Sequence, residues 1–208
     1  GKEVHYFSKH WDQPTAWYAS HYAGAAPQQR CGDITPFYLF HPQAPKRIHS
    51  LLPNAQLIVL LRDPVERALS QYFHSVRLRF ETLPLEDALA AEEERLSTGK
   101  LQHLQEHSYV SRSRYLEQLD RYLELFPGRQ LLVLQSETLF ADPTATWRQI
   151  EAFLDLPQAP CPAAAPKANA GQGEARAVTA GIRRDLRRQL EATALGVRER
   201  FGFGWDWA

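Results

Sequence analysis

Hydrophobic and polar positions along the chain predict strands that alternate with helices. Two uninterrupted apolar runs, Leu57–Leu61 and Leu131–Leu134, have the length and composition of strands buried in a parallel sheet. A helix-start signal follows each run, at 62–64 and at 142–143, with aspartate as the expected cap and proline at the first helical position. This recurrence predicts an α/β fold with a central parallel sheet.

Further elements follow from helical spacing and from turn residues. An apolar stripe at helical spacing predicts a core-facing helix that ends at Pro127-Gly128. The opening piece, Glu3–Phe7, is expected to be extended. Helices are expected over residues 11–22, 64–79, 85–96, 115–126, from 143 onward, and 174–195.

Composition narrows the class of protein. The 208 residues, 44% of them hydrophobic, suffice for one substantial core, so a single domain over 1–208 is expected. The chain has 24 lysines and arginines and 24 aspartates and glutamates, so its formal net charge is zero. No overall positive charge therefore attracts the chain to nucleic acid. No apolar run reaches membrane-spanning length, and two unpaired thiols are expected at Cys31 and Cys161, with a single bridge left open.

The segment after the first strand is the strongest candidate for anion binding. Ligands sit at the carboxyl ends of parallel strands, where a helix start offers unpaired N–H groups. Arg62 stands at that strand end, where its guanidinium can grip a phosphate, and Ser70 lies two helical turns further on. Without other evidence, the same residues also fit a simple helix start.

Several segments together resemble the sulfotransferases that use 3'-phosphoadenosine 5'-phosphosulfate. LLRDPVERALSQYFHSVR resembles their 3'-phosphate motif, and KEVHYF resembles the Lys-Glu-x-His-Phe-Phe element of the heparan-sulfate and bacterial group. GDITPFYLFHPQAPKRIHSLLPNAQ and SRYLEQLDRYLELFPGRQLLVLQSETLFADP extend the similarity over most of the chain. The resemblance implies a three-layer fold like that of P-loop NTPases, and transfer of a sulfuryl group to an acceptor hydroxyl or amine without a metal.

The resemblance also implies roles for individual residues. Arg62 and Ser70 would bind the 3'-phosphate, and Glu3 would be the general base, because a carboxylate that removes the acceptor proton makes the hydroxyl a better nucleophile. His5 would orient that base or contact the acceptor. Lys167 with Asn169 is the candidate for the basic loop that covers the nucleotide in the family.

The chain departs from the family pattern at three places. The glycine-containing loop that holds the 5'-phosphosulfate would precede Gly1, so the chain is expected to be truncated there, and inactive as it stands. Ser8 replaces an acidic residue, and 33–36 lacks a basic one. The acceptor stays open between glycan, lipid, small alcohol, carrier-bound chain and protein tyrosine. Arginine outnumbers lysine 19 to 5, which favours a bacterial cytoplasmic protein, with the Golgi lumen expected for a eukaryotic one.

Other functions were weighed against this one. A non-catalytic nucleotide-binding or interaction domain of the same fold is the main alternative, and the sequence upstream of Gly1 would discriminate between the two. His103, Glu106 and His107 match the H-x-x-E-H pattern of a zinc-peptidase group, but a helix is expected to end there. The arginines between 183 and 188 favour a solvated helix face over a grip for a polyanion.

Overall fold

The computed structural model describes residues 3–26, 28–162 and 173–207. The chain divides into two compact units, which we call the N-terminal unit (1–55 and 118–130) and the sheet unit (56–117 and 131–208). Helices together with parallel strands confirm the predicted α/β class. That the chain forms a single domain stays a prediction.

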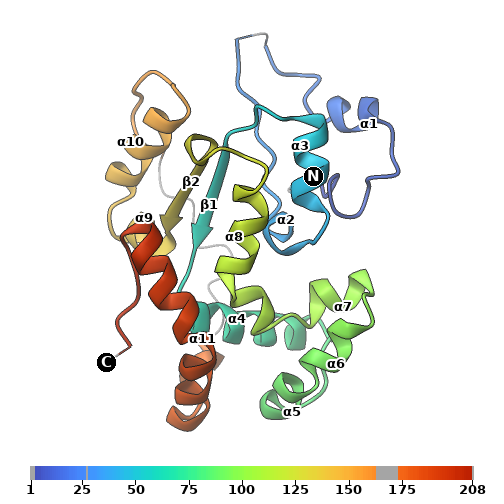
Figure 1. The fold of residues 1–208 in the computed structure, drawn as a ribbon, viewed down its shortest axis with the longest axis vertical. Helices are drawn as coiled ribbons and strands as arrows, with labels where there is room; N and C mark the ends of the chain where they lie inside the picture. Colours follow the sequence, from blue (N-terminus) through green and yellow to red (C-terminus); the bar gives the residue numbers. More distant parts are fainter. Residues whose placement is uncertain (1–2, 27, 163–172, 208) are drawn as a thin grey trace. The chain divides into compact units, whose positions relative to one another are not determined.

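A parallel pair of strands forms the centre of the sheet unit. β1 (Leu57–Leu61) lies beside β2 (Leu131–Gln135), in a register that pairs Leu57 with Leu131 and Leu61 with Gln135 (Figure 1). Both strands occur where the apolar runs predicted them. Since the strands are parallel, their carboxyl ends lie at the same edge of the sheet.

Helix α4 (Pro64–Arg77) leaves the carboxyl end of β1 and packs against α11 (Ala180–Phe201). The Asp63 carboxylate accepts hydrogen bonds from the first turn of α4, as the sequence predicted, and Thr179 caps α11. Gly202 ends α11 with a φ of 75°, which glycine adopts without steric cost. The core between the two helices consists of Val65, Leu69, Val110, Leu186 and Leu190.

The predicted helix over 85–96 is two helices. α5 (Leu85–Ala90) and α6 (Glu92–Ser97) meet at Ala91. The break has a tertiary cause, because Glu92 is buried and its carboxylate accepts hydrogen bonds of 2.8 Å from the backbone of Val110 and Ser111. The sheet unit also contains α7 (Leu101–Glu106), α9 (Ser136–Ala141) and α10 (Pro143–Phe153).

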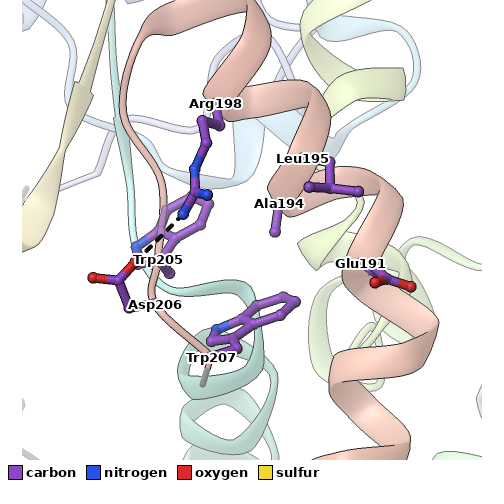
Figure 2. A pocket seen from close by; sticks show the side chains of 7 residues that line it. All are labelled: Glu191, Ala194, Leu195, Arg198, Trp205, Asp206 and Trp207. Carbon is purple, nitrogen blue, oxygen red and sulfur yellow. Dashed lines mark hydrogen bonds and ion pairs between the residues drawn. The ribbon is translucent and has the colours of Figure 1, made fainter.

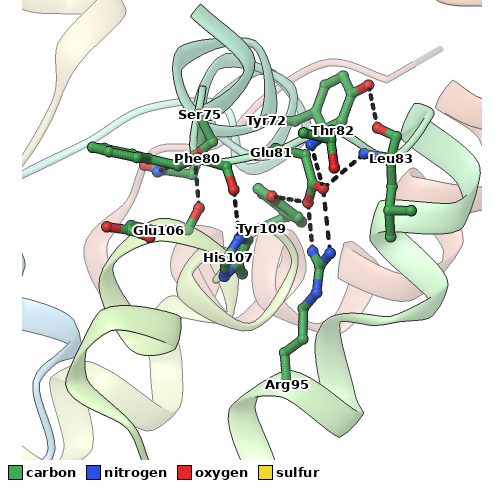
Figure 3. Close-up of polar contacts among 11 residues, drawn as sticks. Tyr72, Ser75, Phe80, Glu81, Thr82, Leu83, Arg95, Glu106, His107 and Tyr109 are labelled. Carbon is green, nitrogen blue, oxygen red and sulfur yellow. Dashed lines mark hydrogen bonds and ion pairs between the residues drawn. The ribbon is translucent and has the colours of Figure 1, made fainter. Parts of the chain in front are cut away.

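A buried carboxylate organises the segment between α4 and α7 (Figure 3). The Glu81 side chain is fully buried and pairs with both terminal nitrogens of Arg95. It also accepts a hydrogen bond of 2.7 Å from the Tyr109 hydroxyl and bonds of 2.9 Å from the backbone of Thr82 and Leu83. These donors hold the pKa of Glu81 at about 2, although burial alone would raise it.

The N-terminal unit is helical and aromatic. It contains α1 (Thr15–Ser20), α2 (Phe37–Phe40), α3 (Ala44–Leu51) and the last part of α8 (Tyr115–Leu123), whose first three residues belong to the sheet unit. The extended segment predicted over Glu3–Phe7 is wrong, because His5 has a φ of 56° and begins a turn. That turn buries the rings of Tyr6 and Phe7.

The helices of the described residues are too short or too polar for a membrane span. None of them has both the length and the apolar composition that crossing a bilayer requires.

Candidate active site

The turn after β1 fixes the backbone of Arg62 and leaves its side chain exposed. The Arg62 carbonyl accepts a hydrogen bond of 2.8 Å from the Tyr115 hydroxyl. The next amide, that of Asp63, donates to Glu137 Oε1 at 2.8 Å. Asp63 Oδ1 in turn accepts from the backbone of Val65 and Glu66, at 2.8 and 3.0 Å. The guanidinium of Arg62 therefore extends from a rigid turn at the carboxyl end of a strand.

Ser70 lies on α4, about 10 Å further along the helix axis than Asp63. Its side chain is half-buried, so the hydroxyl is within reach of a ligand on the helix flank. Within the described part of the chain, neither the Arg62 guanidinium nor the Ser70 hydroxyl is engaged by another side chain.

Arg67 anchors the first turns of α4, a role that the sequence analysis missed. Its guanidinium donates to Ser113 Oγ at 2.6 Å and to the carbonyls of Ser108 and Tyr109. The Ser113 hydroxyl returns to α4 by donating to the carbonyl of Pro64 at 2.7 Å. Burial lowers the pKa of Arg67 below its ordinary value. These partners are a serine and backbone carbonyls, so no complementary charge in the sequence marks the contact.

In the N-terminal unit, Glu3, His5 and Ser8 form a chain of contacts. His5 Nε2 lies 3.0 Å from Glu3 Oε2, and His5 Nδ1 lies 3.2 Å from Ser8 Oγ. Burial, and next the charge of Lys9, lower the pKa of His5, while Glu3 opposes them. A neutral imidazole can donate from Nε2 to Glu3, and the single proton of the Ser8 hydroxyl then goes either to Nδ1 or to the His5 carbonyl, which lies 3.3 Å from Ser8 Oγ.

The segment that departs from the family pattern supports this cluster. The His5 amide donates to Thr35 Oγ1 at 3.5 Å, and the Thr35 hydroxyl donates to Asp33 Oδ1 at 2.7 Å. Asp33 Oδ2 accepts a second hydrogen bond, of 2.8 Å, from the hydroxyl of Tyr38. Asp33 thus orders the loop on which the His5 backbone rests.

Comparison with known proteins gives the family. Residues 6–160 match the profile described as the Sulfotransferase family. The chain belongs to the sulfotransferase family. A sulfotransferase from Alicyclobacillus acidocaldarius has a similar crystal structure, with a TM-score of 0.76 and 26% identity over 93% of this chain and 73% of that one.

Two curated sulfotransferases show how much of a relative the chain covers. The heparan sulfate glucosamine 3-O-sulfotransferase 6 of Mus musculus is 34% identical over 75% of this chain and 44% of its own length. The membrane-associated sulfotransferase kil1 of Dictyostelium discoideum is 27% identical over 74% of this chain and 50% of its own length. The chain therefore spans about half the length of these relatives.

The residues predicted for a sulfotransferase site fall in three places. Glu3 and His5 contact each other in the N-terminal unit, and Arg62 and Ser70 share the start of α4 in the sheet unit. Lys167 and Asn169 lie outside the described residues. Their roles in the reaction stay predictions.

The zinc alternative finds no support in the described residues. They hold no group of three histidine, cysteine, aspartate or glutamate side chains able to bind a metal. Glu106 accepts a hydrogen bond from Gln102 at 3.0 Å, and His107 Nε2 lies 3.0 Å from the carbonyl of Phe80. Glu106 and His107 are therefore engaged by other groups, and the His103 ring lies against that of His107, with 5.3 Å between their centroids.

The arginines of α11 have two kinds of environment. Arg183 pairs with Glu66, and Arg187 donates to the carbonyl of Trp207 at 3.0 Å. Arg184 and Arg188 are exposed, as expected for a solvated face. Two of these four arginines, Arg183 and Arg187, therefore make contacts that hold the fold together.

Proposed function

We propose that the protein transfers a sulfuryl group from 3'-phosphoadenosine 5'-phosphosulfate to an acceptor hydroxyl, without a metal. The exposed Arg62 guanidinium at the carboxyl end of β1, directly before the capped start of α4, is the observation that carries the proposal. Its position is that of an anion site in an open parallel sheet. Membership of the sulfotransferase family supports the reaction type.

The nucleotide would be held through its 3'-phosphate. Arg62 would bind the phosphate with its guanidinium, and Ser70 would donate from the flank of α4. Lys167 and Asn169 are proposed to cover the nucleotide. Because the leaving group is a phosphate, cationic and N–H donors around the nucleotide also stabilise charge that develops during transfer.

Glu3 would act as the general base. As the acceptor oxygen attacks sulfur, the carboxylate takes the hydroxyl proton, a new S–O bond forms, and the S–O bond to the nucleotide breaks. The products are a sulfate ester and 3'-phosphoadenosine 5'-phosphate. Among the described residues, His5 contacts Oε2 of Glu3, and 38% of the Glu3 side chain is exposed, which supports approach of the acceptor to the other oxygen.

The acceptor class is proposed from the relatives. The named function of one relative is sulfation of heparan sulfate glucosamine, so a glycan hydroxyl is the first acceptor to test. A lipid, a small alcohol, a carrier-bound chain and a protein tyrosine complete the panel.

Calorimetry with 3'-phosphoadenosine 5'-phosphate tests the donor site in the protein at its full natural length. Arg62→Ala should weaken binding at least about tenfold, since hydrogen bonds to charged groups contribute roughly 1.5–3 kcal/mol. Arg184→Ala removes an exposed arginine of α11 and is the matched control, with unchanged affinity expected. Equal affinity for Arg62→Ala and the control would contradict the phosphate site.

Transfer of labelled sulfate to the acceptor panel tests the reaction. Glu3→Gln should abolish transfer and leave nucleotide affinity unchanged, because the substitution keeps shape and removes the base. Nucleotide binding without transfer to any acceptor would instead support a non-catalytic binding module.

A further inference from the structure

The aromatic residues after α11 cross the carboxyl edge of the sheet. We call residues 203–207 the C-terminal tail. At β2, the tail is held by Gln135, whose side-chain amide donates to the carbonyl of Gly204 at 2.9 Å. Because Gln135 lies opposite Leu61 in the strand register, the tail then continues towards the turn that carries Arg62.

Two indole N–H groups of the tail bind the two carboxylates of this turn. Trp205 Nε1 donates to Glu137 Oε2 at 3.2 Å, and Trp207 Nε1 donates to Asp63 Oδ2 at 2.7 Å. The other oxygens are occupied as well: Glu137 Oε1 accepts from the Asp63 amide, and Asp63 Oδ1 accepts from the first turn of α4. Every oxygen of the two carboxylates therefore has a donor.

Trp205 also supports the turn through its ring. The side chain is 8% exposed, and its centroid lies 6.2 Å from that of Tyr115. Tyr115 is the residue whose hydroxyl binds the carbonyl of Arg62 at 2.8 Å. The tail thus also supports the Arg62 backbone indirectly, because Trp205 contacts Tyr115 and Tyr115 binds the Arg62 carbonyl.

Packing and polar contacts together hold the end of the tail. Trp207 packs against the core between α4 and α11, and its carbonyl accepts a hydrogen bond of 3.0 Å from Arg187. Further along α11, a hollow of about 330 Å³ has the rings of Trp205 and Trp207 among its walls (Figure 2). The opposite wall includes Leu195, which is 51% exposed. The indole hydrogen bond to Asp63 therefore adds to apolar packing in placing Trp207.

We propose that Trp205, Trp207 and Glu137 are positioning residues that keep Arg62 available for an anion. Asp63 and Glu137 are the carboxylates beside Arg62, and an unoccupied carboxylate oxygen there would compete with phosphate for the guanidinium. The indole donors occupy those oxygens, so the turn stays rigid and Arg62 stays open. This inference rests on the proposed function of Arg62 in binding the 3'-phosphate.

The test compares two nucleotides in the protein at its full natural length. 3'-Phosphoadenosine 5'-phosphate carries the 3'-phosphate and adenosine 5'-phosphate lacks it. We define the ratio as the dissociation constant of adenosine 5'-phosphate divided by that of 3'-phosphoadenosine 5'-phosphate. A large ratio therefore reports an intact contact between Arg62 and the 3'-phosphate. Trp207→Phe keeps an aromatic ring and removes the N–H donor. It should lower the ratio roughly threefold to tenfold, the share of a charge-assisted contact that a competing carboxylate takes.

Three further variants separate positioning from folding. Glu137→Gln and Asp63→Asn each remove the competing charge and place an NH2 group against either the indole N–H or a backbone N–H of the turn. They therefore test the rigidity of the turn alone, and its loss should lower the ratio in the same range. Trp147→Phe, on α10, is the matched control and should leave it unchanged. Partial unfolding alone scales both dissociation constants together, so it cannot move the ratio.

A double-mutant cycle with Arg62→Ala distinguishes the possible failures. The inference requires that Trp207→Phe and Glu137→Gln no longer change the ratio once Arg62 is absent. An undiminished effect in that background would overturn it, as would three variants that leave the ratio unchanged while Arg62→Ala lowers it. If Arg62→Ala itself leaves the ratio unchanged, the proposed phosphate site fails instead.

Discussion

Replacing Glu81 by glutamine should destabilise the fold in a pH-dependent manner. The side chain is fully buried and keeps Arg95, Tyr109 and two backbone amides satisfied. Its pKa falls from 4.5 to about 2 in the folded protein, because these donors outweigh the cost of burial. Since the folded pKa is the lower one, the stabilisation is present above pH 4.5 and is lost as the pH falls towards 2.

The size of the effect follows from the two pKa values. The ionised carboxylate contributes about 3 kcal/mol to the free energy of unfolding at pH 7, and about 1 kcal/mol remains at pH 3. Glutamine cannot ionise, so the difference in stability between the wild type and Glu81→Gln should narrow by about 2 kcal/mol between these pH values. Any loss of packing or of neutral hydrogen bonds adds an offset that does not depend on pH.

Urea unfolding at pH 7 and at pH 3 measures this difference directly. Other titrating groups occur in both proteins, so they cancel in the comparison. Glu94→Gln alters an exposed glutamate of α6 and should give the wild-type pH dependence. A gap between Glu81→Gln and the wild type that is as large at pH 3 as at pH 7 would refute the reasoning.

Substitutions at three other positions test the core, a helix cap and the anchor of α4. Leu190→Ala, at a position with no exposed surface in the core between α4 and α11, should lower the free energy of urea unfolding by about 2–5 kcal/mol. Asp142→Ala removes the 2.9 Å acceptor of the Ala145 amide and should cost about 1 kcal/mol, whereas Asp142→Asn should restore most of it in the same assay. Arg67→Lys should lower the melting temperature and weaken nucleotide binding, because an ammonium group cannot reproduce the guanidinium fork that joins α4 to Ser113. If calorimetry gives an unchanged nucleotide affinity, the role of Arg67 is limited to stability.

The parts of the fold that follow from local chemistry were predictable from the sequence. Leu57–Leu61 is a strand because an apolar run of that length requires burial, and α4 begins where an aspartate cap precedes proline. The break at Ala91 and the turn at His5 were not predictable. Each depends on partners distant in sequence, since Glu92 binds the backbone of 110–111 and the His5 amide binds Thr35.

The candidate site divides in the same way. The Arg62 turn was predictable because strand end, cap and helix start are adjacent in the sequence. Its supports were not: Asp63 and Trp207 are 144 positions apart, and Glu137 is 74 positions from Asp63. An indole N–H that binds a carboxylate leaves no charge pattern or periodicity in the sequence, so only the folded chain brings these residues together.

The occupancy of carboxylate oxygens separates structural acids from a possible base. Glu81, Glu92 and Asp63 each use both oxygens as acceptors within the sheet unit. Of these, Glu81 is a weak base, because its donors outweigh burial and hold its pKa at about 2. Glu3 differs because a single histidine contact engages one of its oxygens and more than a third of its side chain is exposed. A carboxylate must approach the acceptor with an unoccupied oxygen to take its proton, and Glu3 meets that requirement.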